Sequence, residues 1–422
     1  MDKFVEFMNK HFVPLAAKLG NQRHLVAIRD AFVISMPLMI LGSFGTLINT
    51  LPIPAYQNFM TGLFGDTWKI FGTALNNGTF SILSLLTVAA LGYYLGKSYD
   101  EDGLMCSIIA ISSFFVVGGL NGLNSKGLFV ALLCGILSIE IFRRLSGNSK
   151  LVIHMPEGVP PAVGKAFEAL FPSMITLAIF GLIPLIAAAF GIEDIITAFY
   201  ELIQKPFMGL SNNIVAAIVL PFAIQILWFF GLHGGNVLAP FIETINTPAI
   251  DANVLALANG EAAPYLINKS FMTAFIHLGG AGATLGLIIA IFLVGRKVKT
   301  LRTVASLSAP AAAFNVNEPV IFGIPIVLNP MLFIPFVFGP VILCVIAYLA
   351  TLWGLVPAAT FVLPWNIPPI IGGIMATASW QGGVLAAFNL VLSVLIYLPF
   401  VKIMSNQELA KEKKAEQAEQ TA

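Results

Sequence analysis

The chain has 422 residues, of which 58% are hydrophobic and only 10% are charged, and its mean hydropathy is +0.89. Soluble domains carry about 25% charged residues because their surfaces face water, so this composition excludes an ordinary soluble protein and indicates one embedded in a membrane. The net charge of +1 provides no basic field, which argues against a nucleic-acid partner.

The first segment, residues 1–27, predicts a short amphipathic stretch on the cytoplasmic side. It contains four basic residues but no uninterrupted apolar core before Ile28, so it does not resemble a cleaved signal peptide. The residues expected on its apolar side are Phe4, Phe7, Met8, His11 and Phe12.

Long apolar runs follow one another along most of the chain. A bilayer crossing requires about 20 mainly apolar residues. The candidate crossings, in chain order, are residues 28–48, 79–96, 104–118, 127–142, 171–192, 213–232, 271–295, 320–352 and 384–402. Run 320–352 is long enough for one bent crossing or for two. Because hydrocarbon offers the backbone no hydrogen-bonding partner, the runs predict an all-α integral membrane protein.

Basic residues cluster before the first run and after the fourth, seventh and last runs. Loops rich in Lys and Arg face the cytoplasm, which predicts that both termini are cytoplasmic. The early runs satisfy a simple alternation between the two sides. The later ones do not, so one segment among 234–270, 320–352 and 361–379 must add or remove a crossing.

Three stretches in the second half are rich in Gly, Pro and Asn: 231–240, 309–325 and 363–383. They are too apolar for ordinary loops and too interrupted for regular helices. Irregular backbone at membrane depth is tolerated where it lines a polar cavity, so we expect re-entrant hairpins around a solute site.

The interrupted stretches occur only in the second half of the chain, which suggests two functional halves. Residues 28–192 are expected to form a transmembrane scaffold half and a candidate oligomer interface, and residues 212–402 a substrate-binding half. Residues 193–211 predict an interfacial amphipathic linker helix, and residues 403–422 a solvated, frayed cytoplasmic tail.

Ionisable residues inside a membrane are costly and therefore suggest function. Glu318 lies between Asn317 and Pro319, and proline is favoured in the first turn of a helix, which places the carboxylate at a helix N-terminus. If this position only capped a helix, Asn or Ser would serve at a lower free-energy cost in the membrane. The pattern therefore favours a functional carboxylate. Asp30 and His277 are better explained by packing, as an ion pair with Arg29 and a histidine bonded to a carbonyl.

His233 ends an apolar run and precedes two glycines and Asn236, with Trp228 nearby. Polar side chains beside a flat aromatic wall suit a sugar, whose hydroxyls need hydrogen bonds and whose ring stacks on an aromatic face. Trp380 with Gln381, and Trp365 with Asn366, repeat this pairing. These residues therefore form the predicted sugar pocket.

Several kinds of site are not indicated. The sequence contains no metal-ligand cluster, nucleophile triad, phosphate-binding loop or dinucleotide fingerprint, so we expect no metal, no cofactor and no ATP-driven transport. Cys106, Cys134 and Cys344 lie singly in apolar runs, which predicts buried free thiols.

At these residues the chain resembles the IIC permease component of the bacterial phosphoenolpyruvate-dependent phosphotransferase system, in its lactose/cellobiose/diacetylchitobiose family. The segments that carry the resemblance are "NQRHLVAIRDAFVISMPLMILGS" (21–43), "LNSKGLF" (123–129), "WFFGLHGGNV" (228–237) and "FNVNEPVIFGIPIVLNP" (314–330). The resemblance implies about ten transmembrane helices with re-entrant hairpins, a dimerisation half at the N-terminus and a substrate-binding half at the C-terminus, in the bacterial cytoplasmic membrane.

The resemblance also implies a mechanism and partners. The permease would pass a β-linked disaccharide inward, and a separate IIB subunit, supplied by IIA, would phosphorylate a sugar hydroxyl from its phosphocysteine. Glu318 would be the general base for that hydroxyl and His233 would orient it, so the catalytic role is shared with IIB. The expected substrate-binding residues are Asn317, Asn236, Trp228, Trp380, Gln381, Ser125 and Lys126.

The residues alone leave a rival open. An ion-coupled secondary transporter that moves unmodified sugar would also use broken helices and one membrane carboxylate. A passive channel fits a paired histidine and glutamate poorly. The sequence does not distinguish cellobiose from diacetylchitobiose, lactose, lichenan fragments or mannobiose as the solute.

Overall fold

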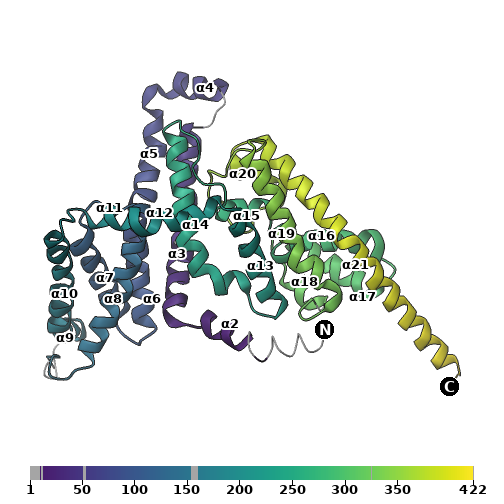
Figure 1. Ribbon diagram of the computed structural model, residues 1–422, viewed down its shortest axis with the longest axis horizontal. Coiled ribbons are helices and arrows are strands. Elements are labelled where there is room, and N and C mark those ends of the chain that lie inside the picture. Colours follow the sequence, from purple (N-terminus) through teal and green to yellow (C-terminus); the bar gives the residue numbers. More distant parts are fainter. Residues whose placement is uncertain (1–9, 11–12, 51–53, 154–159, 325, 422) are drawn as a thin grey trace.

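The computed structural model describes residues 10, 13–50, 54–153, 160–324 and 326–421, and these residues form helices and connecting turns without strands (Figure 1). The predicted apolar side of residues 1–12 lies outside the described residues. Helices α5 to α10 lie on one side of the molecule and α13 to α21 on the other, with α3 between them. The all-α fold predicted from the sequence is confirmed.

The N-terminal half consists of a lead-in helix, one long central helix and a bundle. Its helices are α2 (Val13–Gly20), α3 (Arg23–Thr50), α4 (Pro54–Phe64), α5 (Ile70–Asn77), α6 (Leu83–Lys97), α7 (Gly103–Gly118), α8 (Leu128–Ser146), α9 (Pro161–Glu168) and α10 (Leu170–Ala189). Small residues allow close packing in the bundle: a Cβ added at Gly92 would come within 2.8 Å of the Cys106 carbonyl oxygen. The three cysteines are free and buried, as predicted.

Short helical turns then lead into the C-terminal half. The connecting elements are α11 (Ile195–Phe199), η5 (Tyr200–Gln204), α12 (Lys205–Met208) and η6 (Gly209–Asn212). The helices of the second half are α13 (Ile214–Phe229), α14 (Gly234–Ala258), α15 (Lys269–Phe275), α16 (Thr284–Ala290), α17 (Lys299–Ala312), α18 (Glu318–Gly323), α19 (Pro330–Leu352), α20 (Pro369–Thr377) and α21 (Trp380–Thr421). The segment Ile195–Asn212 makes an angle of 84° with α13, so the predicted linker lies across the direction of the helices.

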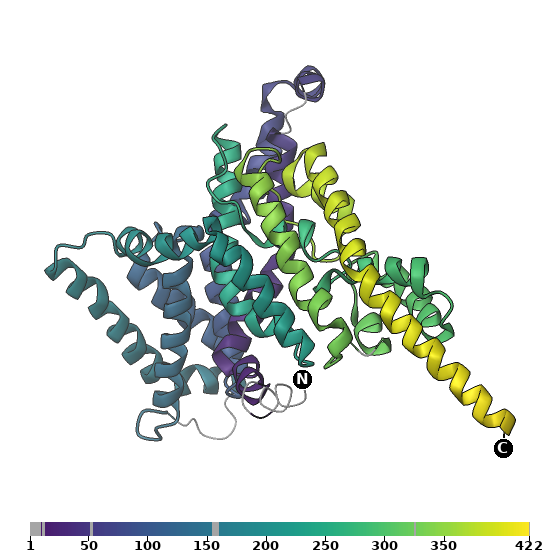
Figure 2. The same cartoon turned by 45° about the vertical axis from the view of Figure 1, so that its right-hand side comes forward.

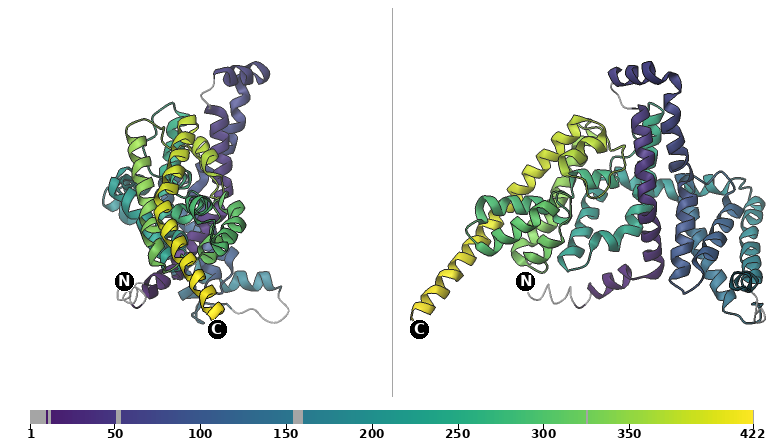
Figure 3. Two further views of the ribbon diagram at one scale, coloured as in Figure 1. Left: turned by 90° about the vertical axis from the view of Figure 1, so that its right-hand side faces the viewer. Right: turned by 180° about the vertical axis from the view of Figure 1, so that it is seen from behind.

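The long helix α3 defines two ends of the molecule, and a group of basic residues lies at one of them. Seen from behind, α3 stands upright between the halves, with α4 at one end and α2 at the other (Figure 3). The chain end of α21 lies on the α2 side in every view, well beyond the bundle (Figure 2). Arg143 and Arg144 join the start of α3 through Glu140 and His24, so these basic residues also lie on the α2 side. We refer to the two ends as the α2 side and the α4 side.

Among the described residues, six helices are long and apolar enough to cross a membrane, or seven if the bent pair around Asn213 is one span. The count of about ten crossings implied by the resemblance therefore stays a prediction. Run 320–352 divides into the short α18, a break, and one long helix, α19, which the sequence had left open.

Two predictions about regular structure were wrong. The predicted crossing 271–295 is interrupted between α15 and η7 (Ala281–Ala283), because Gly279, Gly280 and Gly282 adopt φ angles of 84°, 93° and 76°. A glycine-rich run that resembles a packed helix face can equally form left-handed turns, which cost glycine nothing. Conversely, segment 231–240 is interrupted only before Gly234, and α14 continues through Pro240 and Pro248.

A third prediction failed at the end of the chain. Residues 403–422 were expected to form a frayed tail, yet α21 continues as a helix to Thr421. The charged, alanine-rich composition of this segment suits an exposed helix as well as a solvated coil, since Ala, Glu, Lys and Gln all have high helix propensity.

Within the stretch 363–383, helix α20 turns back into α21, and the re-entrant character of this stretch stays a prediction. Helices α20 and α21 touch backbone to backbone, because a Cβ added at Gly373 would come within 2.3 Å of the Gly382 carbonyl oxygen. The extended segment before α20 is buried, and side chains satisfy its backbone: Ser43 and Ser270 accept from the amides of Val362 and Leu363. Irregular backbone at membrane depth requires such partners.

Candidate functional site

His233 lies in the turn between α13 and α14 and caps α14. Its Nδ1 accepts the backbone N–H of Asn236 at 3.0 Å, and its ring lies 4.3 Å from the buried ring of Trp228. Since Nδ1 acts as the acceptor, the neutral imidazole carries its proton on Nε2. The side chain is exposed, so Nε2–H can donate to a solute. Trp228 supports the histidine from behind instead of lying open to a sugar.

Glu318 is the first residue of α18, as predicted, and its side chain is exposed. An electrostatic interaction links Glu318 with His233, and another reaches His233 from Arg29 of α3. The two residues that the sequence singled out as catalytic therefore lie within electrostatic reach of each other, although 84 residues of chain separate them.

Asn315 ties together the breaks that surround this pair. It has a φ of 63°, is 7% exposed, and accepts the Gly279 N–H at 2.8 Å. Its amide nitrogen donates to the carbonyls of Trp365 and Ile367, each at 3.0 Å. One side chain thus joins the interruption after α15, the turn before α18 and the segment before α20.

Asn317 has a similar supporting contact. It is buried, and its amide nitrogen donates to the Ala281 carbonyl at 2.7 Å. A Cβ added at Gly280 would come within 2.6 Å of the Asn317 side chain, so the glycine is required for this approach. The observed role is to hold the loop beside Glu318, and direct sugar contact by Asn317 stays a prediction.

His277 lies in the same region as His233. It was not assigned to the site from the sequence. It was interpreted as a packing histidine bonded to a carbonyl, but its Nε2 is buried and has no hydrogen-bond partner among the described residues. His277 also lies within electrostatic reach of His233. The signal that could have revealed it is the glycine run that follows, which breaks the helix next to the imidazole.

Other predicted site residues lie elsewhere. Trp380 is 70% exposed at the start of α21, and Gln381 hydrogen-bonds with the hydroxyl of Ser379. Ser379 lines a cavity with Leu257, near the far end of α14 from His233. The structure therefore does not bring Trp380 and Gln381 to Glu318. Trp365 is 52% exposed, and Asn315 holds its carbonyl, so it is the better aromatic candidate.

Ser125 and Lys126 are also separate from the pair. They form part of η4 (Ser125–Gly127) and line a cavity with Asp251, 18 residues beyond His233. Asn236 stays near His233, since it lies in the first turn of α14 and is exposed.

The structure reveals further membrane carboxylates with partners in the second half. Glu243 of α14 forms an ion pair with Lys269 at 2.5 Å and accepts the Thr247 hydroxyl. Its position within a long helix was not recognised, because segment 234–270 was considered only as one of three that could add or remove a crossing. No group of three potential metal ligands occurs among the described residues.

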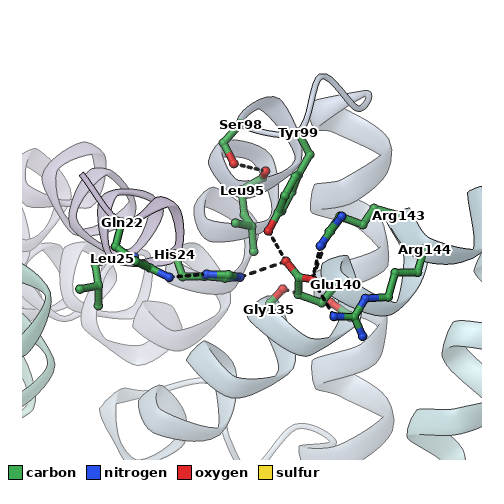
Figure 4. Close-up of polar contacts among 11 residues, drawn as sticks. Gln22, His24, Leu25, Leu95, Ser98, Tyr99, Gly135, Glu140, Arg143 and Arg144 are labelled. Atoms are coloured by element: carbon green, nitrogen blue, oxygen red, sulfur yellow. Dashed lines mark hydrogen bonds and ion pairs between the residues drawn. The ribbon is translucent and has the colours of Figure 1, made fainter. Parts of the chain in front are cut away.

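In a polar cluster on the α2 side, the buried carboxylate also has hydrogen-bond partners (Figure 4). Glu140 of α8 accepts from His24 at 3.0 Å and from Arg143 at 2.7 Å, and it also bonds the Tyr99 hydroxyl. Burial and the bond to Glu140 raise the pKa of Tyr99. The cluster joins the start of α3, the turn before α7 and the end of α8, so we interpret it as a structural clamp.

The histidine provides the first test. His233→Ala should weaken sugar binding at least about tenfold, because a ligand hydroxyl loses the Nε2–H donor. The measurement is equilibrium binding of cellobiose, diacetylchitobiose and mannobiose to the purified protein. His233→Asn is the matched control, since asparagine can cap α14 but lacks the ring. Wild-type affinity in either variant would remove the imidazole from the binding site.

Comparisons with known proteins find related sequences that align with nearly the whole chain. A family model, Phosphotransferase system, EIIC, matches residues 29–340. The oligo-beta-mannoside-specific EIIC component of Bacillus subtilis (strain 168) is 38% identical, with 97% of this chain and 96% of that protein aligned. The cellobiose-specific EIIC component of Geobacillus stearothermophilus is 34% identical over 98% of this chain and 96% of that protein.

The same fold is present in a solved structure. The crystal structure of the transporter ChbC, the IIC component from the N,N'-diacetylchitobiose-specific phosphotransferase system, matches with a TM-score of 0.92 and 35% sequence identity. The match covers 96% of this chain and 99% of that one. The family resemblance seen in the sequence is confirmed, and the chain belongs to the EIIC permease family of the phosphotransferase system.

Proposed function

We propose that this permease binds a β-linked disaccharide of the cellobiose or diacetylchitobiose class at His233 and Glu318 and passes it inward for phosphorylation by a separate IIB protein. The observation that carries the proposal is the electrostatic interaction between these two residues, each of which lies at the start of a helix after a break in the chain. Relatives that handle cellobiose, oligo-β-mannosides and diacetylchitobiose support the substrate class.

The chemistry follows from the two side chains. His233 Nε2–H donates to the oxygen of the sugar hydroxyl and fixes its direction. Glu318 accepts the proton as that oxygen attacks the phosphorus of the IIB phosphocysteine, the new O–P bond forms and the S–P bond breaks. Sulfur leaves as the thiolate, and the sugar phosphate carries the phosphoryl group. Trp365 supplies an aromatic wall for the ring.

The arrangement of charge supports an orientation. The basic residues at the start of α3 and the end of α8 share the α2 side, and Lys402 lies in the part of α21 that extends toward that side. The positive-inside rule then makes the α2 side cytoplasmic, together with both termini. IIB, supplied by IIA, would approach the sugar from this side.

The N-terminal half suits the expected dimer interface. Leu182, Leu185 and Ile186 of α10 expose apolar side chains, and the helix is little buried within one chain. We propose that two copies associate through this half while the C-terminal half carries the sugar.

Reconstituted vesicles test the function. Vesicles that contain the permease with IIA, IIB and the general phosphocarriers should accumulate sugar phosphate only when phosphoenolpyruvate is present inside. A protonophore should have little direct effect, because the phosphoryl group drives uptake. Accumulation of free sugar by the permease alone, abolished by the protonophore, would instead establish the ion-coupled alternative.

A further inference from the structure

A polar cavity lies between the two halves, at the other end of α14 from His233. Its volume is about 470 Å³. Its walls come from α3, α5 and η4 of the N-terminal half, from Tyr200 and Met208 of the linker, and from the last turns of α14. Small-molecule sites typically occupy about 300–1,000 Å³, so the space is large enough for a sugar.

This cavity is distinct from the site at His233 and Glu318. Asp251, which lines it, follows His233 by 18 residues, which corresponds to up to about 27 Å along a helix at 1.5 Å per residue. Asn49, another lining residue, belongs to the last turn of α3, the end of that helix on the α4 side. The cavity therefore opens near the face that the proposed orientation makes external.

The lining is dense in groups that bind hydroxyls. Neutral amides and hydroxyls predominate on the wall from the N-terminal half, including Asn49, Asn76 and Ser81. The amide nitrogen of Asn49 donates to the Lys69 carbonyl at 2.8 Å, while its Oδ1 is buried without a hydrogen-bond partner among the described residues. Because this oxygen packs against Gly72, the other amides and hydroxyls of the wall are the groups available to a ligand.

Charged and aromatic groups complete the cavity. Asp251 is only 8% exposed, and its carboxylate interacts with the Ser125 hydroxyl across the boundary between the halves. The Lys126 ammonium lies 5.8 Å from the centre of the Tyr200 ring. A carboxylate accepts two vicinal hydroxyls of a pyranose, and a tyrosine face packs against its C–H groups.

We propose that this cavity is a second carbohydrate-binding site, an outer vestibule in which the β-linked disaccharide docks before it reaches His233 and Glu318. The inference rests on the proposed function, because it takes the transported sugar as the occupant. A lipid tail is disfavoured by the amides and hydroxyls of the wall. Since both halves and the linker supply walls, movement of one half against the other would open or close the vestibule.

A local fluorescence reporter can test occupancy. Tyr200→Trp is introduced into the full-length protein that also carries His233→Ala and Glu318→Gln, and cellobiose, diacetylchitobiose and mannobiose are titrated in lipid nanodiscs. Emission of the new indole, after subtraction of the same variant with Tyr200, should change and saturate with one of the sugars. Tyr93→Trp, in the bundle of the N-terminal half, is the control and should not respond.

Two outcomes would overturn the vestibule. One is a Tyr200→Trp reporter that fails to respond to any of the three sugars. The other is a response that requires intact His233 and Glu318, since it would report a conformational change driven from the other site.

Transport kinetics provide an independent measurement. Asp251→Asn should raise KM for the sugar about tenfold while kcat stays within about twofold. Lys126→Gln, at an exposed position, should shift KM in the same direction and remains informative if the Asp251 variant does not fold. Lys97→Gln, on the α2 side, is the matched control. Unchanged KM in the Lys126 variant and in a folded Asp251 variant would contradict the proposal.

The two proposals fail separately. Normal uptake by the Glu318→Gln variant, together with a saturating Tyr200→Trp response, would remove the proposed transport site and leave the vestibule. Loss of uptake in the Glu318 variant with a silent reporter would do the reverse.

Discussion

Glu318→Gln should reduce phosphorylation-coupled uptake at least about 100-fold while the protein still binds sugar. Glutamine keeps the shape of the side chain and can hydrogen-bond a hydroxyl, but it cannot accept the proton that leaves during phosphoryl transfer. General-base catalysis typically contributes about 10²- to 10⁴-fold, which sets the expected size of the effect. The measurement is formation of sugar phosphate in vesicles supplied with IIA, IIB and phosphoenolpyruvate.

The control for this variant is Glu193→Gln, which removes an exposed carboxylate in the turn before α11. It should leave uptake unchanged. Equilibrium binding of the same sugar, measured on both variants, separates loss of catalysis from loss of the site. If Glu318→Gln transported sugar at the wild-type rate, the carboxylate would be no more than a residue that stabilises the start of α18.

Asn315→Ala should destabilise the C-terminal half by about 4–10 kcal/mol and abolish sugar binding. The substitution leaves the Gly279 N–H and the carbonyls of Trp365 and Ile367 without their partner, and each buried unsatisfied group costs about 1–3 kcal/mol. Alanine also tolerates a φ of 63° less well than asparagine, which adds about 1 kcal/mol. Thermal unfolding in detergent, followed by intrinsic fluorescence, measures the loss.

Asn315→Asp separates the two hydrogen bonds that Asn315 donates from the one that it accepts. It keeps an acceptor for the Gly279 N–H and tolerates the left-handed conformation, but it loses the two donated bonds, so its stability should be intermediate. Asn21→Ala, at an exposed position between α2 and α3, controls for loss of an amide as such. Wild-type stability of Asn315→Ala would mean that the three breaks are held together by packing alone.

Local pattern was a reliable guide where one feature of the chain decided the structure. The Pro319 signal placed Glu318 at the start of α18, and the apolar run at 330–352 became the continuous helix α19. The same reasoning failed at Gly279–Gly282, because small residues suit both a packed helix face and a left-handed turn. Only neighbours such as Asn315 and Asn317, which bond the loop backbone, favour the turn.

Contacts between residues far apart in the sequence could not be predicted from local patterns. Glu140 belongs to an apolar run that looked like a plain crossing, yet it bonds His24, which lies 116 residues earlier. Trp380 resembled a wall of the sugar site, but the α20–α21 hairpin carries it to the α4 side, away from His233. Neither arrangement has a local signature, because each depends on how whole helices pack.

By itself the sequence determined that the protein lies in a membrane and that it is helical, and it singled out His233 and Glu318 as the predicted site of its chemistry. The charge deficit and the requirement for internal backbone hydrogen bonds in hydrocarbon suffice for the first two conclusions. The tertiary structure decided which broken segments Asn315 joins. It also decided which polar residues enclose the cavity between the two halves. Those contacts arise only when distant segments pack together, so their physical cause is not contained in any one stretch of the chain.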